Sequence, residues 1–165
     1  MAIPKVGDGY QIGDGNTNEA MAKVTPVITT SGATLTCTAA KHGGRTVVLN
    51  STHTQTITLP AASGTGQKYR FAVSVVGTDG SKVIQAANAT DVMQGVCIVN
   101  STATDQASSF LTSATSDTVT LNNTTTGGIV GTIVELEDIA SGTFNVRVYA
   151  AASGTVATPF SAAVS

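Results

Sequence analysis

The chain has 165 residues, a length that fits one domain or one domain with an extended arm. Charged residues make up only 11% of it, well below the ~25% of an average soluble protein, so hydroxyl and amide groups must cover most of the surface. The net charge of -2 offers no cluster of Lys and Arg of the kind that nucleic-acid binding needs. Composition therefore disfavours a nucleic-acid-binding protein and favours contacts between weakly charged protein faces, which cost little desolvation.

The first 24 residues differ from the rest and predict an extended N-terminal arm. Gly7-Asp8-Gly9 recurs as Gly13-Asp14-Gly15, and such turn-forming residues do not build a core. The arm also lacks the apolar run of a secretory signal, and no later run reaches the ~20 apolar residues that span a bilayer. We expect a protein that is made and kept in a cytoplasm, with no membrane partner. The apolar residues of the arm, which we expect to contact another protein or another copy of the chain, are Ile3, Val6, Tyr10 and Ile12.

From residue 25 onward, apolar and polar residues alternate, which predicts strands with one buried face. Residues 25–165 are therefore expected to form a single β domain. The strongest alternation is Tyr69-Arg70-Phe71-Ala72-Val73, and the Asp79-Gly80 dipeptide after it predicts a hairpin. The expected strands are 34–39, 45–50, 54–59, 69–75, 83–87, 96–100, 108–112, 117–122, 129–137 and 144–150.

About ten short strands at a spacing of about 8–12 residues predict an all-β fold, namely a β-sandwich, a jelly roll or a barrel of antiparallel strands. With four Phe, three Tyr and no Trp, the core must consist mainly of Val, Ile, Leu and Ala, which bury less area than aromatic rings. Association of several copies would bury further apolar area and cover strand edges. Cys37 and Cys97 lie in alternating segments, so we expect two small buried residues and no disulfide.

Few residues have the chemistry of a catalytic or metal site. His42 and His53 are the only histidines and stand in polar stretches, so we expect surface histidines and no multi-histidine metal centre. Glu135, Glu137 and Asp138 form the one acidic cluster, with Glu135 and Glu137 on the same face of a strand. Sugar hydrolysis by such a pair needs an opposing carboxylate and usually aromatic platforms. We therefore prefer a solvated edge or an intersubunit contact for the cluster.

Two further patterns also lack the partners that their chemistry would need. Asp8 and Asp14 have neither the Asp ladder nor the distal Glu of a calcium loop, and tight turns explain them better. The glycines around Gly64 and Gly127 are not followed by the Gly-Lys-Ser/Thr of a phosphate loop. The sequence therefore predicts no catalytic residue, no cofactor and no metal, and a protein that is not an enzyme.

Six short stretches carry a resemblance to a known family. They are Thr46–Asn50, Thr56–Ala62, Gly66–Phe71, Ile84–Gly95, Ser116–Asn122 with Gly127-Gly128, and Met1–Gly15. These stretches resemble the small virion structural proteins encoded near the major capsid gene of tailed phages, the capsid decoration or cement proteins. The resemblance covers about residues 45–130 together with the opening of the arm, and it lies in short sequence segments and in composition.

The resemblance implies a protein that binds the outer surface of a tailed-phage capsid, commonly as a homotrimer at three-fold or quasi-three-fold positions. Its partners would be the major capsid protein and other copies of the chain, and the arm would lie along one of them. The location would be the exterior of a virion that is assembled in a bacterial cytoplasm. Because Thr58-Leu59-Pro60-Ala61-Ala62 is also similar to phage fibre proteins, a tail fibre or receptor-binding module remains the alternative.

Overall fold

The structure is a computed structural model that describes residues 27–103 and 105–164. The four arm residues predicted to make contacts lie outside the described residues. The described chain is nearly all β, with one short helix, α2 (Ala39–His42). The strands are β1 (Ile28–Thr30), β2 (Thr34–Thr36), β3 (Thr46–Leu49), β4 (Gln55–Thr58), β5 (Lys68–Val73), β6 (Lys82–Gln85), β7 (Val92–Ser101), β8 (Ala107–Leu111), β9 (Thr118–Leu121), β10 (Ile133–Ala140), β11 (Thr143–Ala152) and β12 (Phe160–Ser161).

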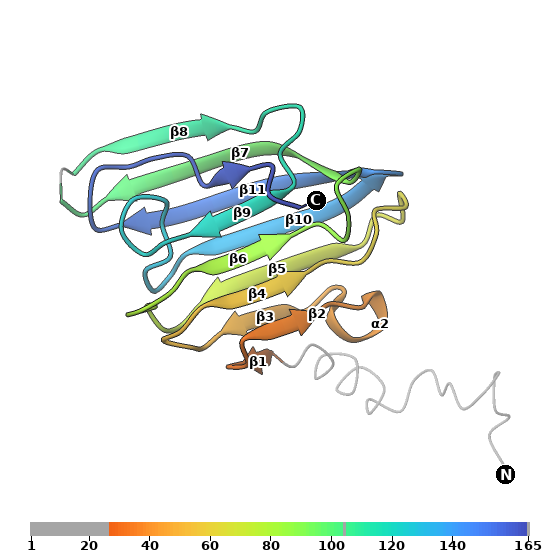
Figure 1. Ribbon diagram of the computed structural model, residues 1–165, viewed down its shortest axis with the longest axis horizontal. Helices are drawn as coiled ribbons and strands as arrows, with labels where there is room; N and C mark the ends of the chain where they lie inside the picture. The colour runs from red at the N-terminus through yellow and green to blue at the C-terminus, as the bar shows by residue number, and fades with distance from the viewer. Residues whose placement is uncertain (1–26, 104, 165) are drawn as a thin grey trace, which may run out of the picture.

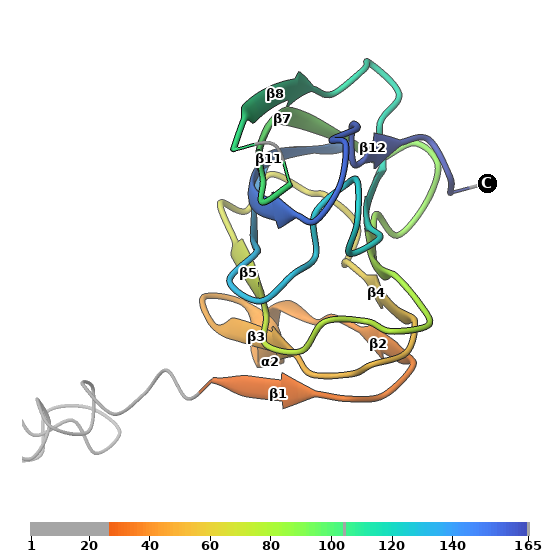
Figure 2. The ribbon, with the colours of Figure 1, turned by 90° about the vertical axis from the view of Figure 1, so that its left-hand side faces the viewer.

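The strands form two mixed sheets that face each other as two layers (Figures 1 and 2). The larger sheet has seven strands in the order β1-β3-β5-β10-β11-β7-β8, and the smaller has five in the order β12-β9-β6-β4-β2. Neither sheet closes into a barrel. The prediction of an all-β protein is therefore confirmed.

The first six strands alternate between the two sheets, and this gives residues 28–85 a coiled path. β1, β3 and β5 stack in parallel in the larger sheet, and β2, β4 and β6 stack in parallel in the smaller one. Each coil crosses from the larger to the smaller sheet at one end of the molecule and returns at the other. A stack of this kind resembles the coils of a β-solenoid, in which each coil is stabilised mainly by its neighbours.

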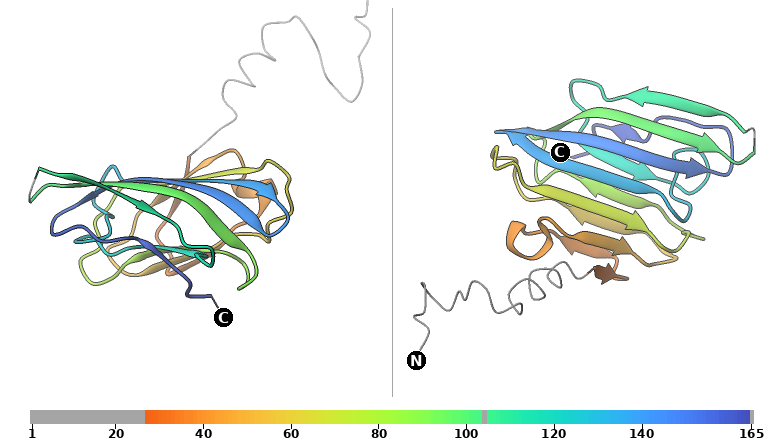
Figure 3. Two further views of the ribbon diagram at one scale, coloured as in Figure 1. Left: turned by 90° about the horizontal axis from the view of Figure 1, so that it is seen from above. Right: turned by 180° about the vertical axis from the view of Figure 1, so that it is seen from behind.

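The remaining strands complete both sheets, and the strands that join the coil stack pair with it antiparallel. β10 pairs with β5 and β9 pairs with β6, so both sheets of the coil stack are continued by the C-terminal half. β11 lies between β10 and β7, and β8 forms the far edge of the larger sheet. Figure 3 shows this larger sheet from outside in its right-hand view.

The core lies between the sheets and consists of apolar residues that stand in register across each of them. Because strand side chains alternate between faces, one inward row per sheet is enough to join all its strands. The row of the larger sheet is Ile28, Val47, Phe71, Val134, Val148, Cys97 and Phe110. The row of the smaller sheet is Leu35, Ile57, Ile84, Val119 and Phe160.

All ten predicted strands are present, with ends that differ by a few residues, and two were missed. β1 and β12 are only three and two residues long, too short for an alternating pattern to reveal them. Residues 39–42, next to the second strand, form the short helix, which Thr38 caps by accepting a hydrogen bond from the Lys41 N–H at 3.3 Å.

Two predictions about strand pairing are wrong. The strands are not all antiparallel, because five of the ten strand pairs run parallel. Asp79-Gly80 does not close a hairpin, because β5 and β6 lie in different sheets. The segment is instead a crossing turn, stacked on the crossing turn of the previous coil through a hydrogen bond from the Thr78 N–H to the Thr52 carbonyl at 2.8 Å.

Candidate functional site

Asp138 is buried and holds a loop of its own protein. Its carboxylate accepts hydrogen bonds from the backbone N–H groups of Ser63, Gly64 and Thr65 at 3.0, 2.7 and 3.1 Å, and from the Thr65 hydroxyl at 2.7 Å. Burial alone raises the pKa of Asp138, but these hydrogen bonds outweigh it and lower the pKa below its ordinary value. Asp138 is thus a structural carboxylate that does not share the environment of Glu135 and Glu137.

Two other buried carboxylates also bind backbone N–H groups. Asp91 accepts from the Ala62 N–H at 2.9 Å and from the Asn88 amide at 3.0 Å. Asp117 accepts from the Ala163 N–H at 2.8 Å and so fastens the segment after β12. Because their lone pairs are already used in the folded state, these groups stabilise loops and are poorly placed to act on a substrate.

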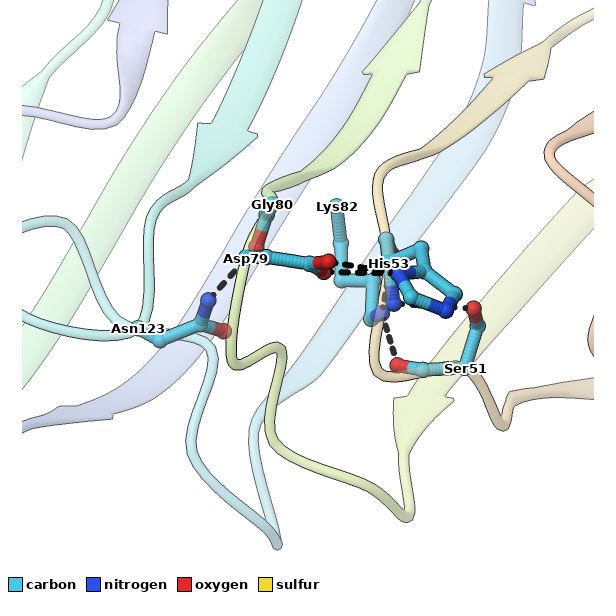
Figure 4. Close-up of polar contacts among 6 residues, drawn as sticks. All are labelled: Ser51, His53, Asp79, Gly80, Lys82 and Asn123. Carbon is cyan, nitrogen blue, oxygen red and sulfur yellow. Dashed lines mark hydrogen bonds and ion pairs between the residues drawn. The ribbon is translucent and has the colours of Figure 1, made fainter.

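Three buried polar side chains close the crossing turns of the coil stack. The Gln55 amide donates to the carbonyls of Thr30 and Gly32, both at 3.1 Å, in the turn of the coil before it. The Lys82 ammonium donates to the carbonyls of Ser51 and His53 in the next turn (Figure 4).

In the third crossing turn, the Asn123 amide donates a hydrogen bond to the Gly80 carbonyl at 2.7 Å (Figure 4). Lys82 is fully buried, and this desolvation lowers the pKa of its ammonium, while the negative charge of Asp79 opposes the shift. Buried backbone carbonyls need hydrogen-bond donors. Each of these side chains supplies donors to carbonyls of a crossing turn in the neighbouring coil. We therefore assign these three buried side chains to stabilising the crossing turns.

The histidines differ from each other in environment. His53 is exposed, as predicted, and its Nδ1 lies 2.7 Å from the Asp79 carboxylate (Figure 4). The prediction of a surface position is wrong for His42, which is only 2% exposed because α2 turns it into the protein. Its Nδ1 accepts from the Thr38 N–H at 2.9 Å. Burial, with the nearby charges of Lys41 and Arg45, lowers the pKa of His42, so it is a neutral structural imidazole.

Both cysteines are free and buried, as predicted. Burial raises the pKa of each thiol, Cys37 and Cys97, to about 12. Neither thiol is therefore a nucleophile at neutral pH.

A hollow of the described surface lies on the outer face of the seven-stranded sheet, over β5, β10 and β11. It has a volume of about 360 Å³ and is open to solvent. Glu135 and Glu137 lie on this face together, as the sequence predicted. Glu135 is paired with Arg70 at 3.3 Å, and Glu137 with Lys68 at 3.8 Å. The two carboxylates therefore face cations, and no described residue of the hollow is an opposing acid for glycoside hydrolysis.

We call the six charged residues around this space the charged hollow: Arg45, Lys68, Arg70, Glu135, Glu137 and Arg147. Arg147 is the direct cross-strand neighbour of Glu135, which also faces Arg70 from the other side. One carboxylate thus stands between two guanidinium groups and bonds only to Arg70 within the described residues.

An apolar patch adjoins the hollow on the same face of the sheet. Tyr149 follows Arg147 by two residues on β11 and is 51% exposed, and its cross-strand neighbour Ile98 is 39% exposed. Leu111, on the edge strand β8, is 78% exposed. We call Ile98, Leu111 and Tyr149 the apolar shelf. Exposed apolar groups beside charges are typical of a surface that binds a protein.

Sequence reasoning found two members of the charged hollow, Glu135 and Glu137, and missed its basic residues. Lys68 and Arg70 are the polar positions of the strongest alternating strand, and Arg147 is a polar position of the last long one. Their alternation shows that they face outward, but it does not show that β10 lies between β5 and β11. No group of three or more His, Cys, Asp or Glu in the described chain is arranged to hold a metal ion.

Comparison with protein-family models, with curated proteins and with solved structures finds no match to this chain. Within residues 27–103 and 105–164, no helix has the length and apolar character that crossing a membrane requires.

Proposed function

We propose that the chain is a structural protein of a virion, a decoration or cement protein that binds the exterior of a tailed-phage capsid. In this proposal it acts as a homotrimer at three-fold or quasi-three-fold positions and has no enzymatic activity. The major capsid protein and other copies of the chain are its partners. Short sequence segments within residues 45–130 resemble such proteins and are the first support for this role.

The main support for this role is that five carboxylates of the described residues already have partners within the protein. The carboxylates of Asp91, Asp117 and Asp138 each bind loops of the chain itself, and Glu135 and Glu137 are paired with cations. The surface that remains for function is a broad sheet face with charges and exposed apolar side chains. Such a face is suited to adhesion, in which many modest contacts act together.

Bound across the boundaries between capsomers, such a protein would have a mechanical role. Packaged DNA pushes a shell outward, and the shell is weakest where capsomers meet. A protein bound across such a seam resists separation in proportion to its own resistance to deformation, and two facing sheets joined by one core are stiff. Three copies binding together would convert weak single contacts into lasting attachment.

The proposal is tested by adding the purified full-length protein to phage shells that lack it. We expect saturable binding, and we expect the decorated shells to release DNA at a higher temperature than bare shells. A Glu135→Gln, Glu137→Gln double variant should still bind the shells and stabilise them, because no hydrolytic step is involved. Absence of binding to every shell tested would overturn the proposal.

A tail fibre or receptor-binding module is the second candidate, favoured by the segment Thr58–Ala62 that is similar to phage fibre proteins. The coiled parallel stack of β1–β6 is compatible with it, because coils of this kind extend readily into long shapes. Labelling the protein on intact particles separates the two candidates. Label over the shell favours a cement protein, and label at the tail favours a fibre.

A further inference from the structure

The charged hollow concentrates positive charge on a chain that is negative overall. The described residues contain six Lys and Arg, of which Lys82 is buried. Four of the other five line the hollow, and Lys41 is the exception. Against them stand two acidic side chains, so the hollow has an excess of two positive charges on a chain of net charge -2. Such an excess attracts an acidic partner and repels a basic one.

Two of these cations have no acidic partner in the part of the chain that the structure describes. Within residues 27–103 and 105–164, neither Arg45 nor Arg147 takes part in an ion pair. Arg147 is exposed, and Glu135, the carboxylate nearest to it across the strands, is already bound to Arg70. A guanidinium forms its strongest pairs with carboxylates, in a planar bidentate geometry. Each of the two arginines therefore has donors to offer to a carboxylate from outside.

The groups around Arg147 argue for a protein as the source of that carboxylate. A polyphosphate has no apolar groups and would leave the exposed side chains of Tyr149 and Ile98 uncovered. The apolar shelf begins next to Arg147, and it would be covered by apolar side chains that follow the carboxylates of a protein segment.

We propose that the charged hollow and the apolar shelf form a docking surface for an acidic segment of another protein, with carboxylates on Arg147 and Arg45 and apolar side chains on Tyr149 and Ile98. This inference takes the identity of the partner, a shell protein, from the proposed function. The location of the surface does not depend on it.

The first test uses a short synthetic peptide of alternating Glu and Val as the probe, titrated into the isotope-labelled full-length protein. We expect saturable shifts of the amides of β5, β10 and β11 around the hollow, and weaker binding as salt is raised. Arg147→Glu should weaken binding about ten-fold or more, because the attraction becomes repulsion. Lys41→Glu changes the net charge equally outside the hollow and should change affinity less than two-fold.

Three results would overturn the docking surface. They are equal binding of a Gln-Val peptide, wild-type affinity in the Arg147→Glu variant, and tighter binding of a single-stranded DNA oligonucleotide to the same amides. The spectrum of each variant shows directly whether it has kept the fold, so a loss of binding cannot be confused with unfolding.

The second test adds the same variants to shells that lack the protein. If wild-type and Lys41→Glu bind and Arg147→Glu does not, both proposals are supported. If all three bind equally, the cement function stands and the docking surface is wrong. If none binds a shell but the peptide still binds the hollow, the docking surface stands and the cement function is wrong.

Discussion

At the scale of single residues, the buried polar groups of this protein are explained by the loops that they hold. Asp138 shows this most clearly, because its carboxylate is the shared acceptor for one turn of backbone, Ser63 to Thr65. The sequence placed it in an acidic cluster with Glu135 and Glu137. Strand alternation separates it from them, because residues at odd and even positions face opposite sides.

Removal of this carboxylate should be costly. We expect Asp138→Ala to lower the free energy of unfolding by about 3 kcal/mol, since several buried donors lose their acceptor at once. Glu137→Gln, which removes only a surface ion pair, should change it by less than about 1 kcal/mol. Urea unfolding followed by circular dichroism measures both. Equal effects of the two substitutions would contradict the structural role of Asp138.

The same carboxylate should contribute to the pH dependence of stability. Its pKa in the folded protein is lowered, so the unfolded state binds its proton more readily. The stabilisation is therefore complete above the unfolded pKa of about 4 and is lost as the pH falls through the lower folded pKa. Unfolding measured from pH 6 to pH 2 should show a smaller acid loss in Asp138→Ala than in wild type. Parallel curves for the two proteins would contradict this linkage.

The two thiols should be unreactive in the native protein. With each pKa raised to about 12 and both side chains buried, the thiolate fraction at pH 8 is negligible. An aromatic disulfide reagent should label two thiols per chain rapidly in urea and neither at a comparable rate without it. Fast labelling of the native protein would show that the core around Cys37 or Cys97 opens readily.

At the scale of elements, the strands were predictable and their partners were not. Alternation locates Tyr69, Phe71 and Val73 on an inward face whichever strand lies beside them. The choice between a hairpin and a crossing turn at Asp79-Gly80 depends on contacts with residues far away in the chain. The Asn123 amide, more than forty residues later, bonds to the Gly80 carbonyl and so fixes that turn.

Gly80 has a steric reason to be glycine that turn statistics do not reveal. A Cβ at this position would overlap the backbone and the hydroxyl of Thr54 in the neighbouring crossing turn. We expect Gly80→Ala to lower the free energy of unfolding by about 1–3 kcal/mol, because the stacked turns must separate. Gly32→Ala is the control, since a Cβ there would meet only the Thr34 carbonyl at 3.6 Å. Thermal unfolding of the two variants compares them, and equal melting temperatures would contradict close stacking of these turns.

At the scale of the whole molecule, the way the two halves are joined decides how the protein unfolds. A coil stack by itself would have nearest-neighbour stability and could fray coil by coil from β1. Here β10 is paired between β5 and β11, and β9 pairs with β6, so the last coil is bound on both sheets by the C-terminal half. If the two halves separated, apolar residues of the core that they share would be exposed to solvent.

We therefore expect residues 68–85 and 118–152 to unfold as one unit. Val134 lies at the junction, in register with Phe71 on one side and Val148 on the other, and is 1% exposed. Val134→Ala should cost about 2 kcal/mol and should lower the hydrogen-exchange protection of β5, β6, β9 and β11 by the same amount, because a cooperative unit shares one opening free energy. Loss of protection in the C-terminal half alone would show instead that the coil stack is stable without it. Under the proposed cement function, which requires resistance to outward strain, the protein would then have a weak boundary between its halves, whereas the cooperative arrangement has no such boundary.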